Sequence, residues 1–171
     1  SVTIGDGVTS IAEDACSYCS SLASVTIGDS VASIAEEAFY NCDSLTSVVI
    51  GDSVETIGVD AFYYCTNLTS VEIPDSVETI GEYAFYHCTS LASLRLPQNL
   101  VSIGESAFRG CSLLKSLAVP EKVEAIGDGA FEDCINLSEM VIPNKVTTIS
   151  SFLFSGCKAL TSVSLPDGII T

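Results

Sequence analysis

The 171-residue sequence has no tryptophan, one histidine and only six basic residues. It also has no uninterrupted apolar run of about 18 residues, which excludes a membrane-spanning helix of the usual length. Against the six basic residues stand 22 acidic ones, which give a formal charge of −16. This charge repels the phosphates of nucleic acids and of anionic lipids. The sequence therefore predicts no nucleic-acid partner and no membrane insertion.

What the sequence does have is a fixed 23-residue period. Seven cysteines mark it without insertion or deletion: Cys19, Cys42, Cys65, Cys88, Cys111, Cys134 and Cys157. Such a period predicts a repeat solenoid, in which similar coils stack around one continuous core. We predict a single domain over residues 1–171, with seven full coils over 1–161 and a partial eighth over 162–171. Because Ser1 begins in mid-pattern without a basic and apolar leader, we expect any secretion signal to lie upstream and the chain to be a fragment of a longer protein.

Eight apolar positions recur in each full coil. In the second coil they are Val25, Ile27, Val31, Ile34, Ala38, Phe39, Cys42 and Leu45. Burying eight side chains does not offset the entropy lost when a whole coil is ordered, so a single coil is not stable alone. Stacking gives each apolar residue an equivalent neighbour above and below. The core is therefore predicted to consist of columns of equivalent side chains.

One side of each coil has the pattern of a β-strand. Residues 24–27 alternate polar and apolar side chains and include β-branched residues, which is typical of a strand with one buried face. A glycine or a proline then interrupts the pattern. The prolines mark where strand pairing stops and the chain turns: Pro74, Pro97, Pro120, Pro143 and Pro166.

The other side of each coil is less clearly defined by its sequence. Val31 and Ile34 belong either to a short extended stretch or to a loose turn, and the sequence does not decide between them. Acidic residues such as Glu36 and Glu37 directly precede the Ala-Phe pair, where a helical turn can begin, because carboxylates favour a helix N-terminus. We therefore predict a parallel stack of short strands with turns or short helical turns on the opposite side.

The phrase Leu-x-x-Val-x-Ile-Pro-x-x-Val-x-x-Ile-Gly-x-x-Ala-Phe-x-x-Cys-x-x-Leu runs through the whole chain. It resembles the BspA-like leucine-rich repeats of bacterial and protist surface proteins, although Gly-Asp or Pro-Asp replaces the asparagine that follows the strand in ordinary leucine-rich repeats. The resemblance implies a right-handed, curved leucine-rich-repeat superhelix with a parallel β-sheet on its concave face. It also implies a secreted or cell-surface protein that adheres to host proteins or to other cells, with no catalytic motif and no cofactor.

The eight cysteines allow three interpretations, namely a disulfide scaffold, a metal site or buried thiols. Adjacent coils place equivalent cysteines about 4.8 Å apart with parallel Cβ directions, which suit a disulfide poorly. We therefore favour buried free thiols that pack as small apolar side chains. Cys16 replaces the usual phenylalanine and forms a lone C-x-x-C with Cys19, which indicates a terminal disulfide or two free thiols more than zinc.

Two further polar features receive structural interpretations. His87 has no histidine partner and is predicted to be a solvated turn residue. An aspartate ladder (Asp6, Asp29, Asp52 and Asp75) suits either Ca²⁺ or ordinary turn chemistry, and an aspartate after Gly or Pro favours the turn. No metal site, no cofactor and no enzymatic activity is predicted, because no unique polar set interrupts the repeat.

Two surfaces vary from coil to coil and are candidates for partner binding. Tyr40, Tyr63 and Tyr86 occupy one turn position in successive coils, with Tyr64 and His87 beside them. Tyrosine is enriched in interfaces, although simple stacking between coils also explains such a row. The outward positions of the strands form the second candidate: Thr26, Val49, Glu72 and Arg95.

These features predict a non-enzymatic protein-interaction or adhesion module of a secreted or cell-surface protein, with a host or cell-surface protein as its partner. A structural spacer or stalk that displays another domain is one alternative. A carbohydrate-binding module is another, which the tyrosines favour and the missing tryptophan does not. Exposed strand edges and an open core at the ends also predict an end-to-end or edge-mediated dimer.

Overall fold

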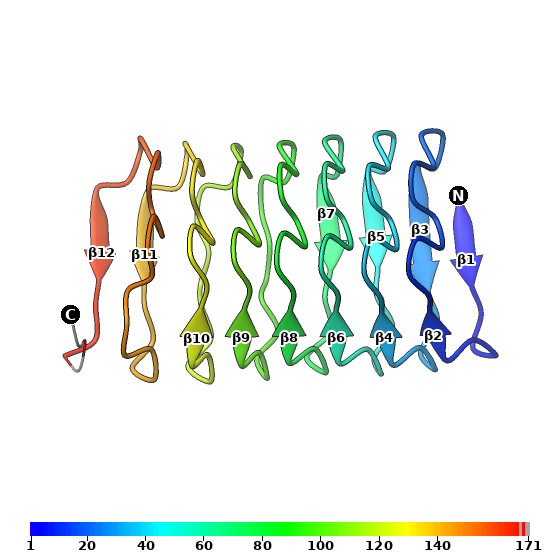
Figure 1. The fold of residues 1–171 in the computed structure, drawn as a ribbon, viewed down its shortest axis with the longest axis horizontal. Coiled ribbons are helices and arrows are strands. Elements are labelled where there is room, and N and C mark those ends of the chain that lie inside the picture. Colours follow the sequence, from blue (N-terminus) through cyan, green and yellow to red (C-terminus); the bar gives the residue numbers. More distant parts are fainter. Residues whose placement is uncertain (168, 170–171) are drawn as a thin grey trace.

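The computed structural model describes residues 1–167 and 169, and it shows coils stacked in sequence order from β1 to β12 (Figure 1). The described residues contain strands and turns but no helix, and hence none that could cross a membrane. The predicted solenoid is therefore confirmed. Of the predicted partial eighth coil, residues 168, 170 and 171 lie outside the described residues.

The first sheet forms where the alternating pattern predicts strands. Its parallel strands pair in the order β1-β3-β5-β7, and β11 and β12 pair separately further along the stack. Each residue faces its equivalent in the next coil, as Val25 faces Val48. The strands are β1 (Val2–Ile4), β3 (Ser24–Ile27), β5 (Ser47–Val49), β7 (Ser70–Glu72), β11 (Glu139–Val141) and β12 (Ser162–Ser164).

This strand face is interrupted in the fifth and sixth coils. Residues 93–95, which are equivalent to β7, form no strand, and Ser116 makes only an isolated bridge with Glu139. The first sheet consequently covers the first four coils, and a shorter one covers the end of the stack.

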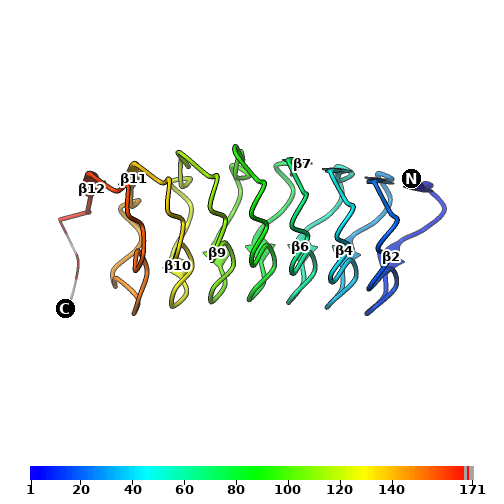
Figure 2. The ribbon, with the colours of Figure 1, turned by 90° about the horizontal axis from the view of Figure 1, so that it is seen from above.

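A second parallel sheet lies on another side of each coil, and Figure 2 shows the two rows of strands running along the stack. Ile34 therefore lies in a short extended stretch rather than a loose turn, and Val31 lies just before this stretch. Ser33–Ile34 pairs with Ser10–Ile11 on one side and with Thr56–Ile57 on the other. The strands are β2 (Ser10–Ile11), β4 (Ser33–Ile34), β6 (Thr56–Ile57), β8 (Thr79–Ile80), β9 (Ser102–Ile103) and β10 (Ala125–Ile126).

The predicted core is confirmed. In the second coil, all eight predicted apolar side chains are at most 2% exposed. Along the stack, the phenylalanines form a continuous column with ring centroids 5.2 to 6.1 Å apart, from the buried Phe39 to the half-buried Phe154. Each ring covers the face of the next one, so every coil completes the core of its neighbours.

The repeated cysteines are buried free thiols in the middle of the stack, as predicted. Each thiol donates a hydrogen bond to a backbone carbonyl of the preceding coil, for example Cys88 Sγ to the carbonyl oxygen of Phe62 at 3.3 Å. Burial raises the pKa of Cys65 and that of Cys111 to about 12, which keeps these thiols protonated as donors. Cys16 replaces the phenylalanine of the first coil, as the sequence shows, and Cys19 differs from the prediction because it is exposed.

The predicted helical turn before the Ala-Phe pair is absent from the described residues, which have a series of turns there. Two residues of each coil have positive φ, for example Glu37 (54°) and Asn41 (53°), which is incompatible with a right-handed helix. The N–H groups of Glu37, Phe39 and Asn41 donate to carbonyls of the next coil over 2.7 to 2.9 Å. These backbone hydrogen bonds join coils and alternate with bonds inside the turn, such as that from the N–H of Tyr40 to the carbonyl of Glu37, whereas a helix would use all of them within one segment.

Candidate functional site

Tyr40, Tyr63 and Tyr86 form a stacked column on the turn side. Their ring centroids are 4.8 Å apart at both steps, with interplanar angles of 6° and 4°. This distance equals the usual spacing of paired strands, so the repeat itself sets the stacking. All three side chains are half-buried, because each covers its neighbour and still presents an edge to solvent.

Other aromatic side chains extend this column. Tyr64 stacks on His87 at 4.9 Å, Tyr18 tilts against Tyr40 at 5.3 Å, and Tyr83 meets Tyr86 edge-on at 5.7 Å. We call the whole group the tyrosine ridge: Tyr18, Tyr40, Tyr63, Tyr64, Tyr83, Tyr86 and His87. It contains all six tyrosines of the chain.

Several ridge residues have an unusual backbone conformation. Tyr18, Tyr64, Tyr83 and His87 all have φ of 53 or 54°. The left-handed region costs a residue with a side chain roughly 1–2 kcal/mol, and asparagine or glycine adopts it more readily. Gly110 occupies the position equivalent to Tyr64 and His87. The aromatic residues thus occupy positions of positive φ that glycine or asparagine would adopt at a lower cost in free energy.

His87 is not the solvated turn residue that we predicted. Its imidazole is half-buried, stacks on Tyr64 and lies over Gly110, where an added Cβ would come within 2.9 Å of the ring. Burial and then the positive charge of Arg109 lower the pKa of His87. The small residue in the next coil therefore makes room for the imidazole and makes it part of the ridge.

The column ends at Arg109, which occupies the repeat position of Tyr86 one coil later. Its guanidinium carbon lies 5.9 Å from the centroid of the Tyr86 ring. The same guanidinium pairs with Glu132 at 2.9 Å and with Asp133 at 3.7 Å. A cation held by one aromatic ring and two carboxylates therefore follows the last tyrosine.

Two carboxylates, those of Glu37 and Asp60, line a groove together with five of the ridge tyrosines. Burial, followed by the charges of Glu37, Glu36 and Glu82, raises the pKa of Asp60 to about 6. Burial and neighbouring acids also raise the pKa of Glu37. Within residues 1–167 and 169, neither of these two side chains makes a hydrogen bond or an ion pair.

The sequence interpretation assigned these acids to a helix start and missed their position beside the tyrosines. The sequence does indicate that these two carboxylates lack a basic partner, because the first of the six basic residues along the chain is Arg95. The first 94 residues contain 14 of the 22 acidic residues and no lysine or arginine. Glu37 and Asp60 consequently lie in a region without a local cation.

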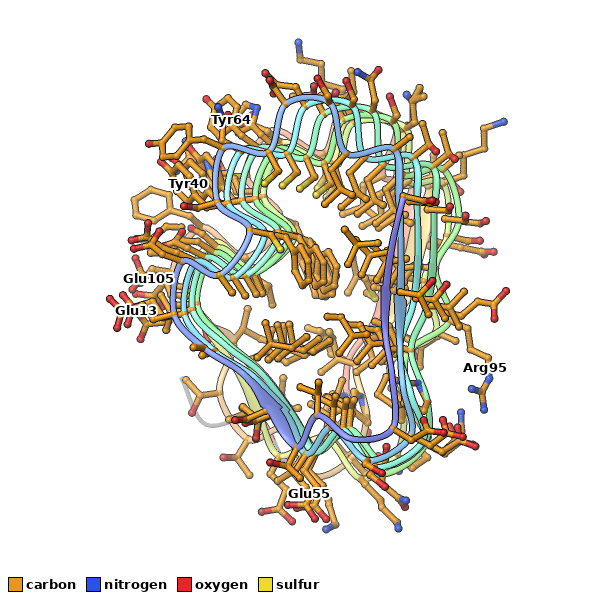
Figure 3. All side chains as sticks on the ribbon, turned by 90° about the vertical axis from the view of Figure 1, so that its right-hand side faces the viewer. Glu13, Tyr40, Glu55, Tyr64, Arg95 and Glu105 are labelled. Atoms are coloured by element: carbon orange, nitrogen blue, oxygen red, sulfur yellow. The ribbon has the colours of Figure 1, made fainter. Side chains whose placement is uncertain are left out.

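The second candidate surface lies on the strand face. Thr26, Val49, Glu72 and Arg95 are all exposed, as predicted, and the first three line a shallow groove along the first four coils. Arg95 pairs with Asp75 at 2.9 Å. Figure 3 shows Tyr40 and Tyr64 on one side of the coil and Arg95 on the other. The predicted site residues therefore form two separate surfaces.

The aspartate ladder bonds to the backbone. Asp6 Oδ1 accepts the N–H of Asp29, and Asp29 Oδ1 accepts the N–H of Asp52, at 3.2 and 3.1 Å. These carboxylates therefore link successive coils rather than act within a single turn. Among the residues that the structure describes, no group of three or more His, Cys, Asp or Glu side chains could hold a metal ion.

Comparison with known proteins agrees with this architecture. A family model for the BspA type leucine rich repeat region, in six copies, matches residues 1–88 and 55–171. The chain belongs to the BspA-type leucine-rich repeat family. Members of the BspA-type family are typically surface-associated and usually non-catalytic, and leucine-rich repeats commonly mediate protein interactions. No curated protein matches the chain.

Solved leucine-rich-repeat structures resemble the chain over most of its length. The T. pallidum leucine-rich-repeat protein TpLRR is 37% identical, with a TM-score of 0.82 over 84% of this chain and 70% of that chain. A Bacteroides ovatus leucine-rich-repeat protein is 27% identical, with a TM-score of 0.62 over 95% and 54%. A Faecalibacterium prausnitzii leucine-rich cell surface protein is 29% identical, with a TM-score of 0.51 over 95% and 59%. The chain thus spans less than two thirds of the latter two proteins.

Proposed function

We propose that the chain is a single non-enzymatic binding domain of a secreted or cell-surface protein, and that it holds a host or cell-surface protein through the tyrosine ridge. The observation that carries this proposal is the gathering of all six tyrosines on one side of the stack, some at backbone positions that disfavour them. Tyrosine offers a large, stiff contact area with a polar tip, which is why it dominates many protein interfaces.

The strand face is a weaker candidate for the same role. Thr26 and Val49 are small, Glu72 is charged, and Arg95 is already paired with Asp75. This surface has no aromatic anchor to fill a pocket in a partner. A carbohydrate would stack on open ring faces, whereas the faces of the central ridge tyrosines cover one another. These observations favour a protein partner.

The test compares the two surfaces on the intact chain. Purified protein is measured by biolayer interferometry against immobilised extracellular-matrix and cell-surface proteins. Tyr63→Ala with Tyr86→Ala should weaken a detected interaction about tenfold or more, because truncating hot-spot residues costs over ~1 kcal/mol each. The matched pair Glu72→Ala with Arg95→Ala, on the strand face, should change affinity less than about threefold.

Circular dichroism must show that both pairs keep their fold. Loss of binding in the strand-face pair alone would assign the interaction to that surface instead. Absence of binding to any protein would favour the spacer, and binding to a glycan array alone would favour a carbohydrate-binding module.

A further inference from the structure

The tyrosine ridge and its acidic neighbours form one groove with a defined chemical character. Its walls are tyrosine rings, and its charged groups are the half-buried carboxylates of Glu37 and Asp60. We propose that this groove binds arginine side chains, so that the protein partner presents a basic segment to Glu37 and Asp60. This inference rests on the proposed function, since it names the chemistry of the partner that the ridge would hold.

Charge complementarity is the first argument. Residues 1–94 carry 14 acidic residues and no lysine or arginine. Arg109 approaches the groove only at Tyr86, and its guanidinium is paired there with Glu132 and Asp133. Partial burial raises the free energy of an ionised carboxylate, and an external cation lowers it again. Figure 3 shows that the acidic residues Glu13 and Glu105 project from the same side as Tyr40, so the surrounding field is also negative.

The spacing of the carboxylates favours a guanidinium. Glu37 and Asp60 occupy equivalent positions in adjacent coils, which places their backbones about 4.8 Å apart. A planar guanidinium presents several N–H groups in a fixed fork and can donate to two carboxylates at once, whereas an ammonium acts as a single point charge. The methylene stem of an arginine can pack along the apolar tyrosine rings.

The chain itself contains one example of such a contact. Arg109 lies over the ring of Tyr86 and pairs with Glu132 and Asp133. A guanidinium on this side of the stack is therefore surrounded by one tyrosine ring and two carboxylates. The groove offers groups of the same kinds, at different repeat positions, in Glu37, Asp60 and Tyr63.

The protonation of Asp60 supplies a further readout. Glu36, Glu37 and Glu82 raise its pKa together with burial, and Tyr40, Tyr63 and Tyr83 lie close enough to be affected by its charge. A bound guanidinium favours the ionised carboxylate. Binding should therefore weaken as the pH falls below about 6, where Asp60 takes up a proton.

The experiment uses the intact chain and a fluorescein-labelled peptide that alternates arginine with glycine and serine. Fluorescence anisotropy is recorded at neutral pH and physiological ionic strength. The control peptides carry lysine or glutamine in place of arginine. We expect the arginine peptide to bind more tightly than the lysine peptide and the glutamine peptide to show no binding.

Paired variants separate the groove from the overall charge. Glu37→Gln with Asp60→Asn should weaken arginine-peptide binding about tenfold or more, through loss of two charge-assisted contacts. Glu55→Gln with Glu78→Gln removes the same charge from exposed positions, and Figure 3 places Glu55 on a different edge from Tyr40. This control should change affinity less than about threefold. Equal losses in both pairs, or no binding of the arginine peptide, would overturn the proposal.

The same variants distinguish this inference from the proposed function. Where a protein partner has been found, loss of its binding in both the tyrosine pair and the groove pair supports both statements. Loss in the tyrosine pair with full retention in the groove pair leaves the ridge as the binding surface and overturns the arginine site. The arginine site would also be overturned if a glycan bound the chain, lost affinity in the tyrosine pair and kept full affinity in the groove pair.

Discussion

Residues 1–94 and residues 95–171 have the same repeating core but different surfaces. The first part has 14 acidic residues, no lysine or arginine and all six tyrosines, whereas the second has eight acidic and six basic residues. In the second part, Arg109 pairs with Glu132, and Lys145 pairs with Glu124. Both parts continue the same phenylalanine column. The fold therefore does not require the acidic and aromatic surface, which makes that surface a candidate for function.

The largest expected effect tests whether the core is shared. Phe62→Ala and Phe108→Ala each remove a fully buried ring, and each should lower the free energy of unfolding by about 3–5 kcal/mol. Urea unfolding can be followed by circular dichroism for the whole chain and by tyrosine fluorescence for residues 18–86. Clearly unequal losses of unfolding free energy in the two variants would contradict a shared core, because the two parts would then depend on their cores to different degrees.

Removing a buried thiol should have the next largest effect. Cys88→Ala and Cys134→Ala leave the carbonyls of Phe62 and Phe108 without a thiol donor. Each substitution should cost about 1–3 kcal/mol, since it removes a buried sulfur from the packed core and one of the two donors to the carbonyl, which keeps the N–H of Cys65 or Cys111. Urea unfolding midpoints measure this loss, and Cys19→Ala at the exposed equivalent position serves as the control. A control as destabilised as the buried variants would contradict a role for the thiol hydrogen bond.

The carboxylate of Asp60 should make the first part more stable in acid. Its pKa is raised from 3.8 to about 6 in the folded chain, so its protonation favours folding. The resulting stability is fully present below pH 3.8 and is lost as the pH rises through about 6. Because the group is partly exposed, we expect Asp60→Asn to stabilise the chain by only about 1 kcal/mol at neutral pH.

Tyrosine-detected urea unfolding across this pH range measures the effect. Asp60→Asn should flatten the pH dependence of the unfolding midpoint. Glu121→Gln, at an exposed position in the second part, should leave it unchanged. If Asp60→Asn had the same pH dependence of the unfolding midpoint as the unsubstituted chain, the ionised Asp60 carboxylate would not destabilise the fold.

The smallest effect is expected at the boundary, where Arg95 reaches back to Asp75. Both side chains are largely exposed, so Arg95→Ala should not measurably change the unfolding midpoint. The hydrogen bond from Arg95, followed by that from the N–H of Gln98, lowers the pKa of Asp75. In the variant, an NMR titration should show this pKa rising toward its ordinary value. A marked loss of stability would mean that Arg95 stabilises the acidic part.

The core and the strand face could be predicted because every coil places the same residue types under the same constraint. Val25 and Phe39 recur at fixed positions, and burial is the only condition that explains all their equivalents. The sequence does not predict the second sheet, because two-residue strands such as Ser33–Ile34 are too short to show alternation. The left-handed residues were missed, since Tyr64 and Glu37 do not carry the glycine signal that usually marks positive φ.

The candidate site was predicted only where it follows the repeat. Tyr40, Tyr63 and Tyr86 share one position, so their alignment follows from the period alone. The contact of Tyr64 with His87 also follows from equivalent positions, but its tight packing depends on Gly110 in the next coil. The lack of a cation near Asp60 depends on where basic residues fall along the chain. Composition totals hide that distribution.

The thiol hydrogen bonds also give the stack a direction. Each cysteine donates only to the coil before it, so every junction has a donor side and an acceptor side. Coils joined head to tail repeat this junction without limit, like monomers in a directional polymer. If two stacks met head to head, two donor sides or two acceptor sides would face each other, and the thiol hydrogen bonds could not form across that junction. Whole coils can therefore be added or removed in one orientation only, and the repeat length is the natural unit for shortening or extending this scaffold.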